Sequence, residues 1–194
     1  MSVSPAIAAQ TTSVTWRIDD HTGADVLADP TPWVKAYEEV YAHALHLPDH
    51  NDPTFAERLA FSAGREGFRL TSCHADGVLA GFAYGYTLPA STGWWNGFTP
   101  LPGVDADEMT AERPGRTFAM CEALVPTAFR RSGIVERAFP FLIRGRTEER
   151  VAGLVAETNA HALDLTLRNG WTHVGDVEPH PGWRRHHALI MPLR

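Results

Sequence analysis

The most informative part of the chain reads Val125-Pro-Thr-Ala-Phe-Arg-Arg-Ser-Gly-Ile-Val135. The residues before it, 118–125, form an apolar run that is interrupted by Glu122, and such a run predicts a buried strand. The turn that contains arginine and glycine then leads into a pattern that predicts a helix over residues 132–146. A strand that enters a helix through such a turn presents unpaired backbone N–H groups and the positive end of the helix dipole. This arrangement binds phosphate, so we expect a cofactor that carries a pyrophosphate group.

A second motif begins one strand later and reads Asn159-Ala-His-Ala162-Leu-Asp-Leu-Thr166-Leu-Arg-Asn-Gly170-Trp171. Together the two stretches resemble the signatures of the GNAT N-acyltransferases. The first signature is Gln/Arg-x-x-Gly-x-Gly/Ala after a strand that ends in Val, and the second is Asn-x-x-Ala followed by Gly-Phe. Glu122 stands where many members carry a strand glutamate. The positions that match are Val125, Arg130, Gly133, Asn159, Ala162 and Gly170.

Two positions depart from the family pattern. Val135 occupies the last Gly/Ala position of the first signature, where a β-branched side chain would crowd the pyrophosphate. Thr166 occupies the place of the usual tyrosine, and a threonine hydroxyl is far too weak an acid to protonate a departing thiolate. These departures keep open an alternative function, a non-catalytic domain that binds or senses acyl-CoA.

The resemblance implies an α/β (α+β) fold. Its central sheet is mixed but mostly antiparallel, with about seven strands flanked by about four helices, and acyl-CoA binds in the cleft where the two central parallel strands splay. We expect residues 1–12 to form a flexible tail and residues 13–194 a single domain. The expected strands are residues 13–19, 68–74, 79–88, 118–125, 151–156, 171–177 and 184–192, and the expected helices are 31–47, 54–62, 132–146 and 159–168.

The resemblance also implies acetyl-CoA as the co-substrate. Backbone N–H groups of the turn are expected to bind its pyrophosphate, with Arg130 and Arg131 in contact with phosphates. Asn159 is expected to bind the pantetheine arm, although asparagine is equally suited to cap the helix that follows. The complete set of expected cofactor-binding residues is Leu124, Val125, Arg130, Arg131, Ser132, Gly133, Ile134, Val135 and Asn159.

Glu122 is the expected general base. A carboxylate in a largely apolar strand has its pKa raised by desolvation, so it can take a proton from the acceptor ammonium near neutral pH. The alternative is a structural charge paired with an arginine. Thr166 is the expected hydrogen-bond donor to the sulfur of the departing CoA thiolate. The alternative is that it only forms part of a helix surface. Tyr84 and Tyr86 are other donors if their strand lines the cleft, and His186 or His187 is the next candidate base.

The acceptor is expected to be a small molecule with a primary amine, and a protein or peptide amine is the alternative. Residues 89–116 form a long connection, and connections of this length are usually functional or disordered. We expect them to shape the acceptor site through Trp94 and Trp95, with Tyr84 and Tyr86 as further substrate-binding residues. The alternative is that the tryptophans cover the core.

Composition excludes several other classes of function. A net charge of -6 and a pI near 5.9 argue against a nucleic-acid partner. No apolar run reaches the length of a membrane span, and the N-terminus lacks the features of a signal peptide, so we expect a cytoplasmic protein. Lys35 is the only lysine, and this bias towards arginine is typical of a bacterium with GC-rich DNA. The ten histidines do not show the ligand spacing of a metal site, so no metal is expected. A homodimer is left open.

Overall fold

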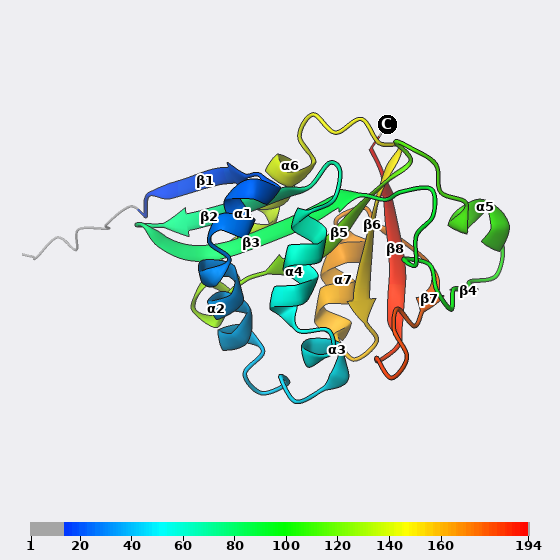
Figure 1. Cartoon of the computed structure of the whole chain (residues 1–194), viewed down its shortest axis with the longest axis horizontal. Helices are drawn as coiled ribbons and strands as arrows, with labels where there is room; N and C mark the ends of the chain where they lie inside the picture. Colours follow the sequence, from blue (N-terminus) through cyan, green and yellow to red (C-terminus); the bar gives the residue numbers. More distant parts are fainter. Residues whose placement is uncertain (1–13, 194) are drawn as a thin grey trace, which may run out of the picture.

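A computed structural model describes residues 14–193, apart from the side chains of Val135 and Glu136. In this part of the chain eight strands form one sheet in the order β1-β2-β3-β5-β6-β8-β7-β4 (Figure 1). The pairing is antiparallel except between β5 and β6, which are parallel. The strands are β1 (Trp16–His21), β2 (Arg69–Ala75), β3 (Val78–Thr87), β4 (Thr99–Pro100), β5 (Thr117–Leu124), β6 (Arg150–Ala156), β7 (Thr172–Val177) and β8 (His186–Pro192).

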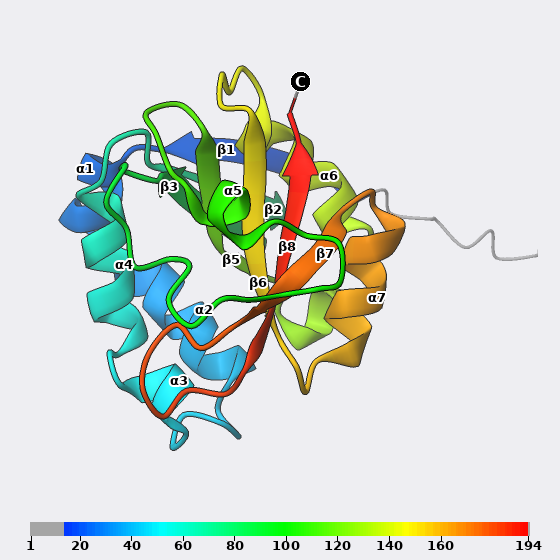
Figure 2. The ribbon, with the colours of Figure 1, turned by 90° about the vertical axis from the view of Figure 1, so that its right-hand side faces the viewer.

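Helices cover both faces of the sheet (Figure 2). One face carries α1, α2 and α4, whose apolar side chains pack on β2, β3 and β5. The other face carries α6, which packs on β1, β2 and β3, and α7; Phe139 and Leu142 of α6 join Leu163 of α7 in a cluster with β5, β6 and β8. The helices are α1 (Gly23–Ala28), α2 (Thr31–Val40), α3 (Pro48–Asn51), α4 (Phe55–Ala63), α5 (Ala106–Thr110), α6 (Ile134–Ile143) and α7 (Ala160–Arg168), with a 3₁₀ turn η1 (Thr127–Phe129).

The predicted fold class and order of major elements are confirmed. The short elements α1, α3, α5 and β4 were not predicted, because pieces this short carry too little periodicity to be recognised. The helix predicted over residues 31–47 ends at Val40. The chain then continues as turns, in which the Ala44 N–H donates to the Tyr41 carbonyl and the Leu47 N–H to the Ala44 carbonyl, each three residues back. The expected tail, residues 1–12, lies outside the described residues.

Local signals in the sequence set the start of α4 and the β2–β3 turn. Thr54 and Glu57 form the expected capping box, with the Thr54 N–H 2.8 Å from the Glu57 carboxylate and the Glu57 N–H 3.3 Å from the Thr54 hydroxyl. Asp76 and Gly77 both have positive φ, at 49° and 83°, which is the backbone of a tight two-residue hairpin turn.

Helix α6 contains Pro140 in its interior and is continuous through it. It starts at Ile134, after Gly133 with φ 76°, and it ends at Ile143, three residues before the predicted end. The guanidinium of Arg69 on β2 donates to the carbonyls of Phe141, Leu142 and Arg144 at 3.3, 3.2 and 2.7 Å. The carbonyls at the end of a helix have no partner within the helix. Arg69 supplies one and ties α6 to the sheet.

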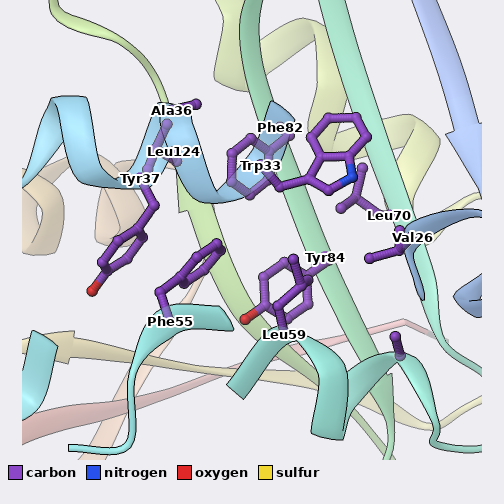
Figure 3. Packing of buried hydrophobic residues seen from close by; sticks show 11 residues of the cluster. Val26, Trp33, Ala36, Tyr37, Phe55, Leu59, Leu70, Phe82, Tyr84 and Leu124 are labelled. Carbon is purple, nitrogen blue, oxygen red and sulfur yellow. The ribbon is translucent and has the colours of Figure 1, made fainter. Parts of the chain in front are cut away.

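The core under α2 and α4 is aromatic (Figure 3). Tyr37 of α2 stacks on Phe55 of α4 with ring centroids 4.0 Å apart. On β3, Tyr84 lies edge-on to the Phe55 ring and Phe82 lies tilted to it. Such packing adds about 0.5–1.5 kcal/mol per aromatic pair beyond the burial of area. It fixes α2 and α4 against the middle of β3 and β5.

Within the described residues, no helix is both long enough and apolar enough to cross a bilayer.

Candidate active site

The two parallel strands at the centre of the sheet separate halfway along their length. β5 and β6 pair from Thr117 with Arg150 to Met120 with Gly153, and within the described chain their ladder stops there. A cleft of about 1390 Å³ opens beyond this point. Its walls include residues 120–125 of β5 and the strand end, residues 154–156 of β6, and parts of α2, α4, α6 and α7. The sheet therefore provides a cleft where the resemblance predicted one.

A β-bulge in β5 shapes the wall of the cleft. Gly85 of β3 lies opposite Met120 and Tyr84 lies opposite Glu122, so Cys121 is an extra residue on β5. A bulge bends its strand and changes the direction of nearby side chains, and such features are frequent beside active sites. Both Cys121 and Glu122 line the cleft as a result.

Glu122 is half-buried in the cleft wall. Burial raises the pKa of its carboxyl to about 7, against the lowering effects of the Arg58 charge, the Ala123 N–H and the Tyr41 hydroxyl. Near neutral pH this group exists in both its protonated and its ionised form, as a general base requires. Burial also raises the pKa of the neighbouring Cys121 thiol to about 12, so that thiol stays protonated and is a poor nucleophile.

A hydrogen-bonded network lines the cleft on the side of α2 and α4. The Arg58 guanidinium donates to the Tyr37 hydroxyl at 2.8 Å, and that of Arg184 donates to His50 Nε2 at 3.1 Å. Arginine has no acceptor atom, so His50 Nε2 must carry the lone pair and Nδ1 the hydrogen. His50 Nδ1 therefore donates to the Tyr37 oxygen, 2.7 Å away. Burial lowers the pKa of His50, which is consistent with a neutral ring.

The β7–β8 loop covers one end of the cleft. The Trp183 indole N–H donates to the Asp52 carbonyl at 2.8 Å, and Arg184 Nε donates to the buried Asp49 carboxylate at 2.7 Å. Both acceptors belong to the segment around α3, so two distant parts of the chain are joined across the cleft. Five of the side chains that line the cleft could not be identified from the sequence, because only the folded chain brings them to the cleft that Glu122 lines: Tyr37, Tyr41, His50, Arg58 and Arg184.

The expected pyrophosphate turn connects β5 to α6. Arg131 has φ 67° and Gly133 has φ 76°, and the Ser132 hydroxyl donates to the Phe129 carbonyl at 2.5 Å. These contacts fold the turn so that the N-terminus of α6 begins directly after Gly133. Ile134 is buried and lines the cleft, whereas Arg130 and Arg131 are exposed. The expected crowding by the Val135 side chain lies outside what the structure describes.

The end of β5 and the start of α7 also contribute to the cleft wall. Leu124 is buried and Val125 is half-buried, and both line the cleft. Asn159 and Thr166 lie on the cleft wall formed by α7. Asn159 caps the helix, with its side-chain oxygen 3.1 Å from the Ala162 N–H. The Thr166 hydroxyl donates to the Ala162 carbonyl at 2.7 Å, so its hydrogen is engaged within the helix.

The two tryptophans of residues 89–116 have different surroundings, which corrects the prediction for Trp95. Trp94 is half-buried and lines the cleft near Tyr86. Trp95 is buried in the core, and the described lining of the cleft does not include it. Its indole N–H donates to Glu112 at 2.9 Å, and the Arg150 guanidinium lies 5.2 Å from its ring. Trp95 is therefore a core group, as the alternative interpretation held.

Tyr84 and Tyr86 are both buried, and both reach the cleft. Burial raises the pKa of each hydroxyl above its ordinary value. Each is therefore a weaker acid than free tyrosine. Of the two candidate histidine bases, His186 lines the cleft and His187 contacts Asp176.

Comparison of the sequence with protein-family models and with curated proteins finds no match. Solved structures resemble this chain over 92–94% of its length. YncA of Salmonella typhimurium, solved with its cofactor acetyl-CoA, is 18% identical, with a TM-score of 0.60 over 92% of this chain and 94% of that one. A GNAT-family protein of Desulfovibrio desulfuricans is 12% identical, with a TM-score of 0.58 over 94% and 100%. The ribosomal-protein-S18-alanine N-acetyltransferase of Escherichia coli is 15% identical, with a TM-score of 0.57 over 92% and 94%.

These likenesses extend over nearly all of each chain, so they concern the complete fold and not a shared fragment. At such low identity they are informative about the fold alone. The chain has the fold of the GNAT acetyltransferases.

Proposed function

We propose that this protein is an N-acetyltransferase, which moves an acetyl group from acetyl-CoA to the primary amine of a small molecule by direct attack in a ternary complex. The observation that carries the proposal is the Glu122 carboxyl, with its pKa near 7, in the cleft where β5 and β6 separate. YncA, which has the same fold, was solved with acetyl-CoA, and this supports the choice of co-substrate.

The proposed reaction begins with an acceptor amine in its ammonium form. Glu122 removes one proton, directly or through a water molecule, and the amine nitrogen then attacks the thioester carbonyl carbon. A backbone N–H near Val125, at the end of the strand, donates to the thioester carbonyl oxygen, where negative charge develops. The resulting tetrahedral intermediate gives the second proton of its nitrogen to solvent and collapses, so that the C–S bond breaks, the amide forms and CoA leaves as a thiolate. Positioning of the two reactants supplies most of the rate enhancement.

The identity of the group that protonates the thiolate follows from what the site offers. Thr166 is too weak an acid, and its hydrogen is already donated to Ala162. The raised pKa values of Tyr84 and Tyr86 make them unsuitable donors at neutral pH. CoA thiolate is a tolerable leaving group near neutral pH, so the proposal assigns this proton to solvent.

A small acceptor suits the part of the cleft that the β7–β8 loop lines. The contacts of Trp183 with Asp52 and of Arg184 with Asp49 hold the β7–β8 loop over it, which favours a molecule that fits inside. Aromatic rings from α2, α4, β3 and residues 89–116 supply the walls. A protein N-terminus is the runner-up acceptor, because one structural neighbour is a ribosomal-protein-S18-alanine N-acetyltransferase.

Two measurements on the purified protein distinguish an enzyme from a non-catalytic sensor that only binds CoA. Mass spectrometry first determines whether CoA or acetyl-CoA co-purifies, and release of the CoA thiol is then measured with a panel of amines. The panel contains aromatic amines, polyamines, amino acids and N-terminal peptides. Turnover with small amines supports the proposal, turnover with peptides alone supports the runner-up, and binding without turnover on any amine supports the sensor.

Replacement of Trp94 and of Trp95 by alanine is expected to have different effects, because one ring lines the cleft and the other lies in the core. Trp94→Ala removes a ring that lines the cleft, so it should raise the acceptor KM with little change in CoA affinity. Trp95→Ala removes a buried ring and leaves Arg150 and Glu112 badly packed, so it should cost about 3–5 kcal/mol of stability. Steady-state kinetics and denaturant unfolding measure the two effects. An unchanged acceptor KM for Trp94→Ala would remove Trp94 from the acceptor site.

A further inference from the structure

Three side chains with metal-binding chemistry converge on β7 and β8, outside the cleft. His173 Nε2 lies 3.1 Å from Asp176 Oδ1, and His187 Nδ1 lies 2.8 Å from the same oxygen. The nearest donor atoms of the three groups all lie within 4.8 Å of one another. The side chains of His173, Asp176 and His187 are 22%, 18% and 21% exposed, so a small ion and one or two waters can reach them.

The backbone is built so that these three residues share one place. In a regular strand His173 and Asp176 would face opposite sides of the sheet, because side chains alternate. A register shift between His173 and Gly175 removes that alternation and brings both side chains to the same face. Asp176 is directly paired with His187 on β8. The bulge therefore completes a cluster that neither strand could form alone.

The spacing of the donor atoms suits a tetrahedral divalent metal. Zn²⁺ binds imidazole nitrogen and carboxylate oxygen at about 2.0–2.2 Å, so two of its ligand atoms lie about 3.3 Å apart in a tetrahedral site. The distances from Asp176 Oδ1 to His173 Nε2 and to His187 Nδ1 are 3.1 and 2.8 Å, and a small side-chain rotation can bring both to that value. Three protein ligands leave a fourth position for water, as in open zinc sites.

We propose that His173, Asp176 and His187 bind one divalent transition-metal ion of the Zn²⁺ type. The ion would join β7 to β8 at the bulge and stabilise the folded chain by mass action, because it binds the folded state in preference to the unfolded one. No metal was expected from the sequence. His173 and Asp176 have no recognised ligand spacing, and the pairing with His187 exists only in the sheet.

Two neighbours act against binding of the ion: one contacts a ligand nitrogen, and the other places a positive charge beside the Asp176 carboxylate. The Gly175 carbonyl lies 2.9 Å from His173 Nε2, and Arg185 Nε lies 3.4 Å from Asp176 Oδ2. In a purely structural cluster, both imidazoles donate a hydrogen to Asp176 and the carboxylate also pairs with Arg185. In the metal-bound cluster, those two ring nitrogens carry lone pairs and Asp176 uses Oδ1 for the metal. The test must distinguish these two states.

Glutamine is the informative replacement for each histidine. His173→Gln and His187→Gln keep an N–H that can donate to Asp176, so they preserve the structural cluster but remove an imidazole ligand. Binding of Zn²⁺ is measured by calorimetry and by the rise in melting temperature, and binding of Co²⁺ by its visible absorption spectrum. The matched control is His161→Gln, because His161 is exposed on α7.

The wild-type chain and His161→Gln are expected to bind one Zn²⁺ and to show the spectrum of tetrahedral Co²⁺. Each ligand variant should lose affinity by more than the roughly 10–100-fold that loss of an outer-shell partner costs. Arg185→Gln removes the competing cation and should bind Zn²⁺ more tightly. Three results would overturn the proposal. They are no Zn²⁺ binding by the wild-type chain, Zn²⁺ binding by the two histidine variants that is as tight as that of the wild-type chain, or weaker Zn²⁺ binding by Arg185→Gln. If a glutamine variant does not fold, the Co²⁺ spectrum of the wild-type chain decides alone.

Discussion

Glu122→Gln is expected to lower turnover at neutral pH by about 10²–10⁴-fold, the usual contribution of a general base. CoA affinity should stay within about twofold, because the amide keeps the size of the carboxyl and only the proton acceptor is lost. Turnover is measured by thiol release and CoA affinity by calorimetry. The matched control is Glu38→Gln, an exposed acidic residue on α2 that should behave as wild type.

The pH profile gives an independent test of the same residue. Below about pH 7 the Glu122 carboxyl is protonated and cannot take a proton, so kcat/KM should rise as the pH increases through about 7. Glu122→Gln should lose this acidic limb. Retention of most of the activity together with the same limb would place the base elsewhere, and His186, which lines the cleft, would be tested next.

Stability provides a check that Glu122→Gln is folded. The pKa of Glu122 is raised in the folded chain from 4.5 to about 7, so the folded state holds its proton more tightly than the unfolded state. This stabilising contribution is complete below about pH 4.5 and is lost as the pH rises through about 7. The neutral amide does not ionise, so the variant should be at least as stable as wild type at neutral pH. Thermal unfolding at two pH values measures the difference.

Gly133→Glu is expected to abolish CoA binding. Gly133 precedes α6 with φ 76°, where the backbone N–H groups of the helix start are expected to receive the pyrophosphate. A glutamate there blocks the approach of the phosphates and adds a negative charge beside them. It also places a side chain in the left-handed region, at a cost of about 1–2 kcal/mol.

Gly115→Glu separates the last effect from the first two. Gly115 has the same φ of 76°, and nothing lies within 4 Å of the position that a Cβ would take. It therefore carries the same backbone strain and the same added charge, but at a distance from the cleft. Calorimetry should show wild-type CoA affinity for Gly115→Glu and none for Gly133→Glu. Unchanged affinity in a folded Gly133→Glu protein would remove the turn from the CoA site.

The elements that follow from local chemistry could be predicted from the sequence. The apolar run before Val125 predicted β5, the Thr54–Glu57 capping box predicted the start of α4, and Asn159 predicted the start of α7. Each depends on residues that are close together in the chain. The motif order was sufficient to predict the fold class, and the location of Glu122 within a cleft followed from it.

Other features depend on register between distant strands, and the sequence does not reveal register directly. The bulge at Cys121 appears only when β3 is aligned with β5, and the cluster around Asp176 only when β7 is aligned with β8. Trp94 and Trp95 are adjacent and chemically identical, so the sequence could not show which one lines the cleft. Trp95 is the buried one because its indole N–H donates to Glu112 and its ring packs against the Arg150 guanidinium.

A crystal structure of the protein with CoA tests the central claim most directly. The account predicts that the pyrophosphate contacts the backbone N–H groups of residues 131–135. The pantetheine arm should run between β5 and β6, and the thiol should lie beside Glu122, beyond the last paired residues Met120 and Gly153. CoA bound elsewhere on the chain, or a thiol that lies away from Glu122, would contradict it.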